Sequence, residues 1–408
     1  MDWHGFLLGK DTDFLYYCRL NRDAYETLTF PAAGHGVFHA VPERLPQSGA
    51  RGQESPGRAR GDFRQQLPFT GRAGYYASLK QSWLPKENDR EHILLVYHHF
   101  IDQNPVLLRL YQDRKGNPVE EIIQEYPFET NSATPQTLAA VIADAEKAWP
   151  AARHGMILWS HATGFLPPGY YISPKEQAGG ASLLSFAEDH GTEIDLLDLR
   201  QTLSQHHYDF LVFDCCLMAN VEVAYELRNC CDYIVFSPTE ILSDGFPYEK
   251  IVQPLFTQSA EEAMKFVCKS YMDLYLSQSG IYRSATISLV RTADLEALAA
   301  ACRPIFQNHR DQILTINRSG IQPYFRYDKH WYYDLDDFVG HVASDSEYRS
   351  FITALDRAVI YKDATEAFLS IDINNYSGLS IYIPRAEYTV LNNYYKTLQW
   401  NRATGLVQ

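Results

Sequence analysis

The sequence has no long apolar run and no excess of positive charge. No stretch of 18 or more consecutive apolar residues occurs in the 408-residue chain, so no transmembrane helix is predicted. Lysine and arginine total 36 against 50 acidic residues, a net charge of −14, which argues against a nucleic-acid-binding surface and mildly favours basic substrates. Residues 1–14 lack a basic start and a long apolar segment, so no signal peptide is visible.

Cysteine is present, but its spacing excludes two common uses. Four of the seven cysteines form two adjacent pairs, Cys215–Cys216 and Cys230–Cys231. Adjacent pairs make neither a disulfide framework nor a spaced metal-binding motif. We therefore expect reduced, mostly structural thiols.

The composition predicts three regions. Residues 45–73 are rich in Gly, Pro, Arg and Gln and have no apolar period, which is typical of a disordered linker. We interpret residues 1–86 as a partly disordered N-terminal region, either a pro-segment or sequence upstream of the true start, and favour the second. Residues 87–300 form the predicted core, and residues 301–408 are predicted to be a C-terminal extension packed on it.

Strand-like and helix-like segments alternate through the core. Apolar runs at 92–100, 156–159, 208–213 and 232–240 alternate with helical periodicities at 134–149, 193–205 and 218–229. Such alternation predicts an α/β fold whose mainly parallel sheet is flanked by helices on both faces.

Polar, reactive residues follow two of these predicted strands. Ser160 and His161 follow the second strand, and Asp214, Cys215 and Cys216 close the third. Chemistry in open α/β sheets gathers at the carboxyl ends of the strands, and a thiol at the start of the next helix has a lowered pKa. The arrangement favours a Cys–His pair for acyl transfer.

The residues alone leave alternatives open. Spacing does not choose between Cys215 and Cys216, and a cysteine at a strand end is more often a packing residue. A metal site from two histidines and a thiol has no ligand spacing to support it. Other histidines compete for the role of base: His98, His99, His190, His206 and His207.

Longer motifs add a resemblance. The chain resembles the clostripain family of cysteine peptidases, relatives of gingipains and caspases, in the segments ILWSHATGF (157–165), FDCCLMANVEVAYEL (213–227), DYIVFSPTEILSDGFPYEKIV (232–252) and GLSIYIP (378–384). The family pattern reads aromatic, Asp, small, Cys, Leu, Met, followed by Glu-Val-Ala-Tyr-Glu-Leu. The similarity runs from about residue 91 to beyond 291 and continues more weakly to 400.

The resemblance implies roles for particular residues. It identifies Cys216 as the nucleophile of a caspase-like fold and His161 as the base and acid, with oxyanion donors at the Cys216 amide and just after His161. The family more often has Gly where this chain has Ala162, so we expect Gly164 to supply the backbone freedom instead.

The resemblance also implies specificity for arginine, or lysine, before the cut bond. Asp214 and Asp244 match the family's acidic positions in the substrate pocket, although alone they read as a helix cap and a turn residue. Lys175, the single basic residue of the Pro- and Gly-rich segment 166–184, is the candidate for self-cleavage.

We therefore predict a cysteine endopeptidase acting on basic protein or peptide substrates. The alternatives are an inactive caspase-like binding protein and a thiol or metal hydrolase. No cofactor is expected, with a calcium requirement left open because some family members have one. The resemblance favours secretion or the cell envelope.

Overall fold

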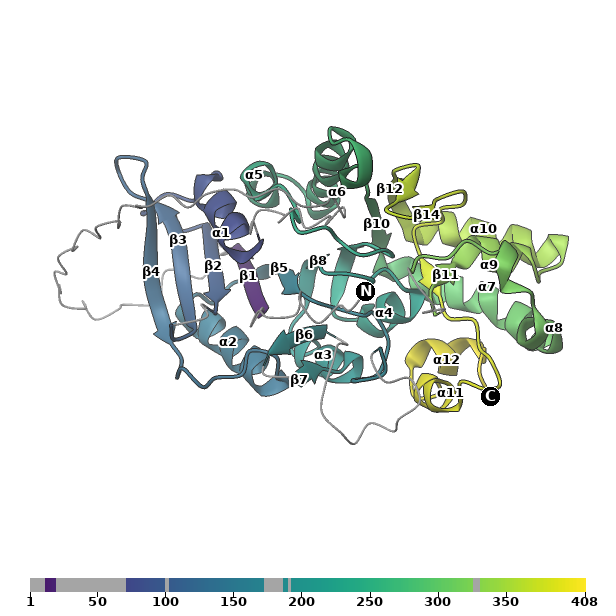
Figure 1. The fold of residues 1–408 in the computed structure, drawn as a ribbon. Helices are drawn as coiled ribbons and strands as arrows, with labels where there is room; N and C mark the ends of the chain where they lie inside the picture. Colours follow the sequence, from purple (N-terminus) through teal and green to yellow (C-terminus); the bar gives the residue numbers. More distant parts are fainter. Residues whose placement is uncertain (1–11, 20–70, 100–102, 172–185, 190–191, 326–330) are drawn as a thin grey trace, which may run out of the picture.

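The computed structural model describes residues 12–19, 71–99, 103–171, 186–189, 192–325 and 331–408 (Figure 1). Within them, nine strands form one sheet in the order β12-β10-β9-β8-β5-β1-β2-β3-β4. The strands are β1 (Thr12–Arg19), β2 (His92–His98), β3 (Val106–Gln112), β4 (Pro118–Glu125), β5 (Arg153–Ser160), β8 (Tyr208–Asp214), β9 (Cys231–Phe236), β10 (Thr286–Arg291) and β12 (Val359–Ala364).

Helices cover both faces of this sheet (Figure 1). One face is packed by α1 (Gly71–Gln81), α5 (Tyr248–Thr257) and α6 (Ala260–Leu276). The other face is packed by α2 (Pro135–Ala148), α3 (Leu196–Leu203) and α4 (Val221–Leu227). The hydrophobic cluster on this side extends through α7 (Leu295–Asn308), α8 (Arg310–Thr315), α9 (Leu335–Gly340), α10 (Asp345–Ala358), α11 (Thr389–Tyr395) and α12 (Gln399–Thr404). The predicted α/β layers are confirmed.

Strand β8 shows how the sequence produces these layers. Successive side chains of a strand point to opposite faces. Accordingly, Phe210 and Val212 are buried in the cluster under α5 and α6, whereas Leu211 and Phe213 are buried in the cluster under α3 and α4. An uninterrupted apolar run therefore serves both cores at once.

The strands at the centre of the sheet run parallel. β5 pairs with β8, and β8 with β9, in parallel register. β2, β4, β5, β8, β9 and β12 share one direction, and β1, β3 and β10 run against it. The parallel centre brings the carboxyl ends of β5, β8 and β9 to one edge.

The N-terminal region contributes a strand that the sequence analysis did not anticipate. β1 lies between β2 and β5 and pairs antiparallel with both, so backbone from before the 45–73 segment lies inside the core sheet. A short apolar strand that is completed only by distant neighbours has no local signature to reveal it. The role of residues 1–86 as a pro-segment or upstream sequence stays a prediction.

The C-terminal residues join the same fold. α7 crosses the expected boundary at residue 300, and β12 is an edge strand of the main sheet. Two short strands, β11 (Tyr333–Asp334) and β15 (Ser380–Ile381), pair with each other, and Ser380 also bridges to Asn220. Smaller pairs are formed by β6 (Phe186–Asp189) with β7 (Thr192–Ile194), and β13 (Ala367–Phe368) with β14 (Ile371–Asp372).

Two other expectations were tested by the fold. The helix expected at 134–149 is confirmed as α2, with Thr134 as its N-cap accepting the Thr137 amide at 3.1 Å. Across the described ranges, every helix is too short or too polar to cross a bilayer.

Candidate active site

His161 and Cys216 follow two adjacent parallel strands at the same level. The register of β5 and β8 pairs Trp159 with Asp214, and each candidate lies two residues beyond that pair. Adjacent strands are about 4.8 Å apart, so the two backbones emerge side by side at the carboxyl edge of the sheet. Both residues are half-buried, which leaves each partly open to solvent.

The two neighbouring thiols differ in environment. Cys215 is buried, its Sγ contacts the Leu158 carbonyl oxygen at 3.1 Å, and burial raises its pKa well above the usual value. Cys216 is the single cysteine that is not fully buried among the six whose side chains are described. A thiol must reach solvent and ionise to act as a nucleophile, so the structure favours Cys216.

The turn that carries Cys216 is held by the loop after β9. Leu217 adopts the left-handed conformation with φ of 59°, and its amide donates to the Thr239 carbonyl at 2.9 Å. The amide of Ile241 points at Cys216 Sγ at 3.4 Å. An N–H donated to sulfur favours the thiolate.

The start of the next helix was predicted incorrectly. We expected it from residue 218, close enough to stabilise the thiolate through its free amides. Instead α4 begins at Val221, five residues after Cys216. The dipole effect is confined to the first turn of a helix, so the Ile241 amide is the nearer polar group.

The loop after His161 explains the unusual Ala162. Of the described residues other than glycine, only Leu217 and Leu369 have positive φ, so Ala162 is unstrained. Gly164 has φ of 67°, as expected, and therefore supplies the left-handed turn. Its Cα packs so closely on the other loop that a Cβ would lie 2.0 Å from Asn220 Oδ1.

Asp214 ends β8 as a buried acid. Its side chain is 4% exposed and accepts hydrogen bonds from the Tyr248 hydroxyl at 2.9 Å and the Phe246 amide at 3.4 Å. Burial outweighs these bonds and raises the pKa of Asp214 to about 7. The helix-cap interpretation is wrong, because this side chain bonds to the 246–248 segment and α4 begins seven residues later.

Asp244 is exposed in the turn before α5, and Gly245 follows it with φ of 55°. The turn is held by Tyr275, whose hydroxyl donates to the Gly245 carbonyl at 3.2 Å. Burial raises the pKa of Tyr275, and the charges of Asp214, Asp244 and Cys216 raise it further. Asp214, Asp244 and Cys216 therefore all lie near enough to this phenol to affect its ionisation.

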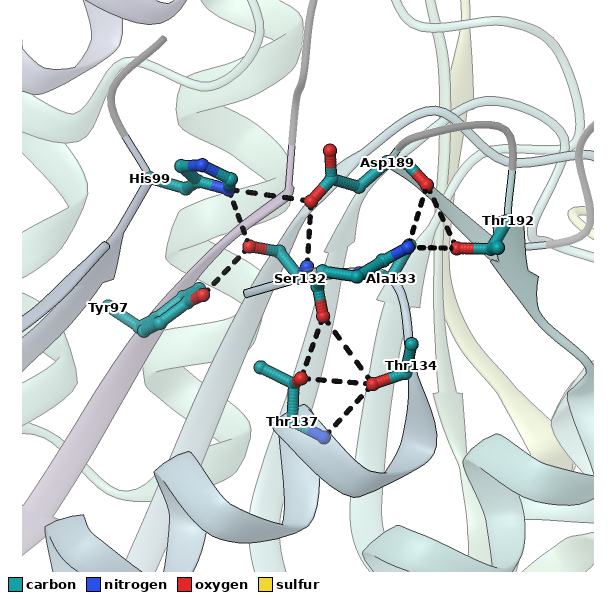
Figure 2. Close-up of polar contacts among 9 residues, drawn as sticks. Tyr97, His99, Ser132, Ala133, Thr134, Thr137, Asp189 and Thr192 are labelled. Carbon is teal, nitrogen blue, oxygen red and sulfur yellow. Dashed lines mark hydrogen bonds and ion pairs between the residues drawn. The ribbon is translucent and has the colours of Figure 1, made fainter. Parts of the chain in front are cut away.

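His99, a rival base, belongs to a separate buried cluster (Figure 2). Its Nδ1 lies 2.7 Å from Ser132 Oγ and 3.5 Å from Asp189 Oδ2, and the Ser132 amide donates to Asp189 at 2.8 Å. A hydrolytic triad needs serine and acid on different ring nitrogens, whereas here both face Nδ1. The three side chains are buried, so the cluster is structural.

The other rivals are also engaged elsewhere. His98 stacks on Tyr76 with ring centroids 4.6 Å apart, and His207 lies 2.9 Å from Asp232. His206 and His207 precede β8 and so lie at the opposite edge from Cys216.

His190 and the cleavage candidate Lys175 lie outside the described residues. Within the described ranges, no group of three or more His, Cys, Asp or Glu side chains is arranged to hold a metal ion.

Sequence reasoning missed the residues that support the site. Tyr248 and Tyr275 hold the acidic loop, and Asn220 joins the two loops that carry His161 and Cys216. All three reach partners at least 30 residues away. No periodicity or spacing signals such contacts.

Comparisons with known proteins found a matching family model and similar solved structures. A family model described as the clostripain family matches residues 84–405. An inactive zymogen C11 protease from Parabacteroides distasonis is 31% identical with a TM-score of 0.70, covering 81% of this chain and 92% of that one. A secreted C11 cysteine protease from Bacteroides thetaiotaomicron, solved with an irreversible peptide inhibitor, is 27% identical with a TM-score of 0.68, covering 81% and 94%.

These similarities confirm the predicted caspase-like α/β architecture over most of the chain. Among curated protein sequences, no similar one was found.

Proposed function

Because the chain belongs to the clostripain family and is therefore a cysteine-type endopeptidase, we propose that it cleaves peptide bonds after arginine or lysine. In this proposal Cys216 is the nucleophile and His161 is the base and acid. Asp214 and Asp244 bind the basic side chain that precedes the cut bond.

The observation that carries the specificity is the state of Asp214. It is a buried carboxyl two residues from the nucleophile, and no lysine or arginine of the described residues pairs with it. A buried acid without a cation is costly to ionise. A guanidinium brought by the substrate offsets that cost with charge-assisted hydrogen bonds, so a basic substrate is favoured over a neutral one.

The chemistry proceeds in two stages. His161 takes the Cys216 proton, the thiolate adds to the substrate carbonyl, and backbone amides stabilise the oxyanion. The C–N bond then breaks, His161 returns the proton to the leaving amine, and a thioester remains. Water, deprotonated by His161, adds to the thioester, and departure of the thiolate releases the new carboxyl terminus.

Maturation by self-cleavage at Lys175 is part of the proposal. The Parabacteroides distasonis relative is described as an inactive zymogen, which supports processing in this group. We also propose that the enzyme acts outside the cell or in the cell envelope, since the Bacteroides thetaiotaomicron relative is described as secreted. Fractionation of the producing cells, with detection by antibody, tests this location.

Matched peptide substrates test the specificity. Fluorogenic peptides that differ only in arginine, lysine, citrulline or leucine before the reporter are compared by kcat/KM. Citrulline keeps the shape of arginine without its charge, so the expected order is arginine and lysine well above citrulline and leucine. Equal rates for arginine and citrulline contradict the proposed role of the acids. Repeating the assay with EDTA and with added calcium measures any metal requirement.

A further inference from the structure

Asn220 connects three segments that are far apart in the sequence. Its Oδ1 accepts the Phe165 amide at 3.1 Å, in the loop after His161. Its Nδ2 donates to Ser380 Oγ at 2.8 Å, in β15. The residue itself ends the loop that carries Cys216.

The side chain does this instead of capping a helix. Asn220 is the N-cap residue of α4, with extended φ and ψ of −98° and 146°, yet its side chain makes no capping hydrogen bond. Asparagine at this position ordinarily accepts an amide of the first helical turn. Here Asn220 Oδ1 accepts the Phe165 amide of the loop after His161 instead. The side chain therefore joins two loops and does not cap the helix.

The two loops touch directly at Gly164. A Cβ there would lie 2.0 Å from Asn220 Oδ1 and 2.5 Å from the carbonyl oxygen of Leu217, the residue after the nucleophile. No side chain fits at Gly164, so the backbones of the two loops pack closely beside the Asn220 side chain. Asn220 and Ser380 are completely buried, and water therefore cannot replace their hydrogen bonds without entering the core.

The C-terminal residues hold both loops in place. Ser380 donates its amide to the Ala219 carbonyl at 2.8 Å, beside Asn220. Tyr332 donates its hydroxyl to the Thr163 carbonyl in the His161 loop. The frame around the reacting pair is thus completed by residues more than 100 positions after Cys216.

We propose that Asn220 is a positioning residue that sets the separation of His161 and Cys216, with Ser380 as its anchor. The inference rests on the proposed function of that pair. A displacement of about 1 Å between reacting groups lowers rates by about a hundredfold. The hydrogen bonds of the Asn220 side chain, which join the two loops, should therefore have a large effect on catalysis.

The pH dependence of Cys216 alkylation tests whether Asn220 sets the distance between His161 and Cys216, and it requires no substrate turnover. Iodoacetamide reacts with the thiolate, and peptide mapping assigns the modified cysteine. A histidine beside the thiol extends reactivity below the ordinary thiol pKa of about 8.5. We expect Asn220→Ala to move the profile at least one pH unit towards that value. It should also lower kcat for an arginine peptide about 10- to 100-fold with little change in KM.

Two further variants separate positioning from folding. Asn220→Asp keeps the acceptor for the Phe165 amide and loses the donor to Ser380, so it should fall between wild type and Asn220→Ala. Asn401→Ala is the matched control, because Asn401 is also buried and bonds the Val407 amide and carbonyl at 2.7 and 2.8 Å, in the C-terminal segment. It should lower Tm and leave the alkylation profile unchanged.

Each outcome decides the proposal. If Asn220→Ala lowers Tm as Asn401→Ala does but keeps the wild-type profile and kcat, Asn220 is only structural and the inference is wrong. If Asn220→Ala does not fold, Asn220→Asp and Ser380→Ala decide in the same way. If His161→Ala itself leaves the profile unchanged, the proposed pair is wrong and the failure lies there.

Discussion

Tyr248 donates its phenolic hydrogen to the buried carboxyl of Asp214 across 2.9 Å, from the first turn of α5 to the last residue of β8. The bond fixes the position of the carboxyl group. Burial raises the pKa of Asp214 to about 7. Burial favours the neutral form of Asp214, and the cationic side chain of a basic substrate, as proposed, would favour the ionised form. The relationship links specificity to pH.

Removing the charge of Asp214 should reduce the preference for basic substrates. Asp214→Asn keeps an oxygen for Tyr248 but cannot ionise. Loss of one partner of a buried charge pair costs about 2–5 kcal/mol, so kcat/KM for arginine peptides should fall about 30-fold or more. Leucine peptides should gain relative to arginine. Equal losses for both would mean that Asp214 supports the fold and does not bind substrate.

The pH dependence of KM gives an independent reading of the same acid. Burial raises the pKa of Asp214 to about 7, so raising the pH through 7 increases the ionised fraction. KM for arginine peptides should therefore decrease over that interval, whereas KM for leucine peptides should not. Asp214→Asn is expected to remove the difference between the two profiles.

The nucleophile can be assigned between adjacent cysteines. Cys216→Ala should abolish cleavage of arginine peptides with the fold intact, because it removes the accessible thiol. Cys215→Ala should keep most activity, with some loss of stability from the cavity left by a buried side chain. His161→Ala should lose nearly as much activity as Cys216→Ala, because the two residues act as a unit. An inactive Cys215 variant beside an active Cys216 variant reverses the assignment.

Self-cleavage is expected after Lys175. Purified wild-type protein should slowly give two fragments held together without a covalent bond, and the new amino terminus should be Glu176. Cys216→Ala should remain one chain, and Lys175→Ala should remove this cut while the catalytic residues stay intact. Intact mass and N-terminal analysis measure both. The same cut in Cys216→Ala would mean that another protease makes it.

Glu222 predicts the direction of the pH dependence of stability. It is fully buried in α4, accepts the Tyr395 hydroxyl at 2.6 Å and the Tyr382 amide at 3.0 Å, and has its pKa raised from 4.5 to about 7 by burial. A raised pKa means that the folded state binds the proton more tightly than the unfolded state. Its contribution to stability is therefore complete below pH 4.5 and is lost as the pH rises through 7.

Glu222→Gln should flatten this dependence, because glutamine does not titrate. The rise in the pKa of Glu222 corresponds to about 3 kcal/mol of unfolding free energy lost between acid and alkaline pH. Urea unfolding at pH 5 and pH 8.5 measures the change, with the variant gaining relative to wild type at the higher pH. Exposed Glu129 provides the control, since Glu129→Gln should leave the slope as it is.

The sequence by itself determined the strands that carry the reacting groups. The apolar run 208–213 predicts β8 because its side chains are buried on both faces of the sheet. If β5 and β8 are taken to be parallel, the sequence also places His161 and Cys216 at the same edge. The ordered motifs likewise identify the family. The apolar run is a local feature, and the motifs are local segments in a fixed order. Both can therefore be recognised in the sequence without knowledge of the tertiary structure.

Only the tertiary structure decided how those groups are surrounded. The sequence does not distinguish Cys215 from Cys216. In the fold the Cys215 thiol contacts Leu158 in the core, whereas the Cys216 thiol contacts the loop that contains Ile241, so the two differ in exposure. Asn220 meets Ser380 across 160 residues, and β1 pairs with β2 although more than 70 residues separate the two strands in the sequence. These contacts depend on how distant segments pack against each other, and the periodicity of a single segment contains no information about its partner.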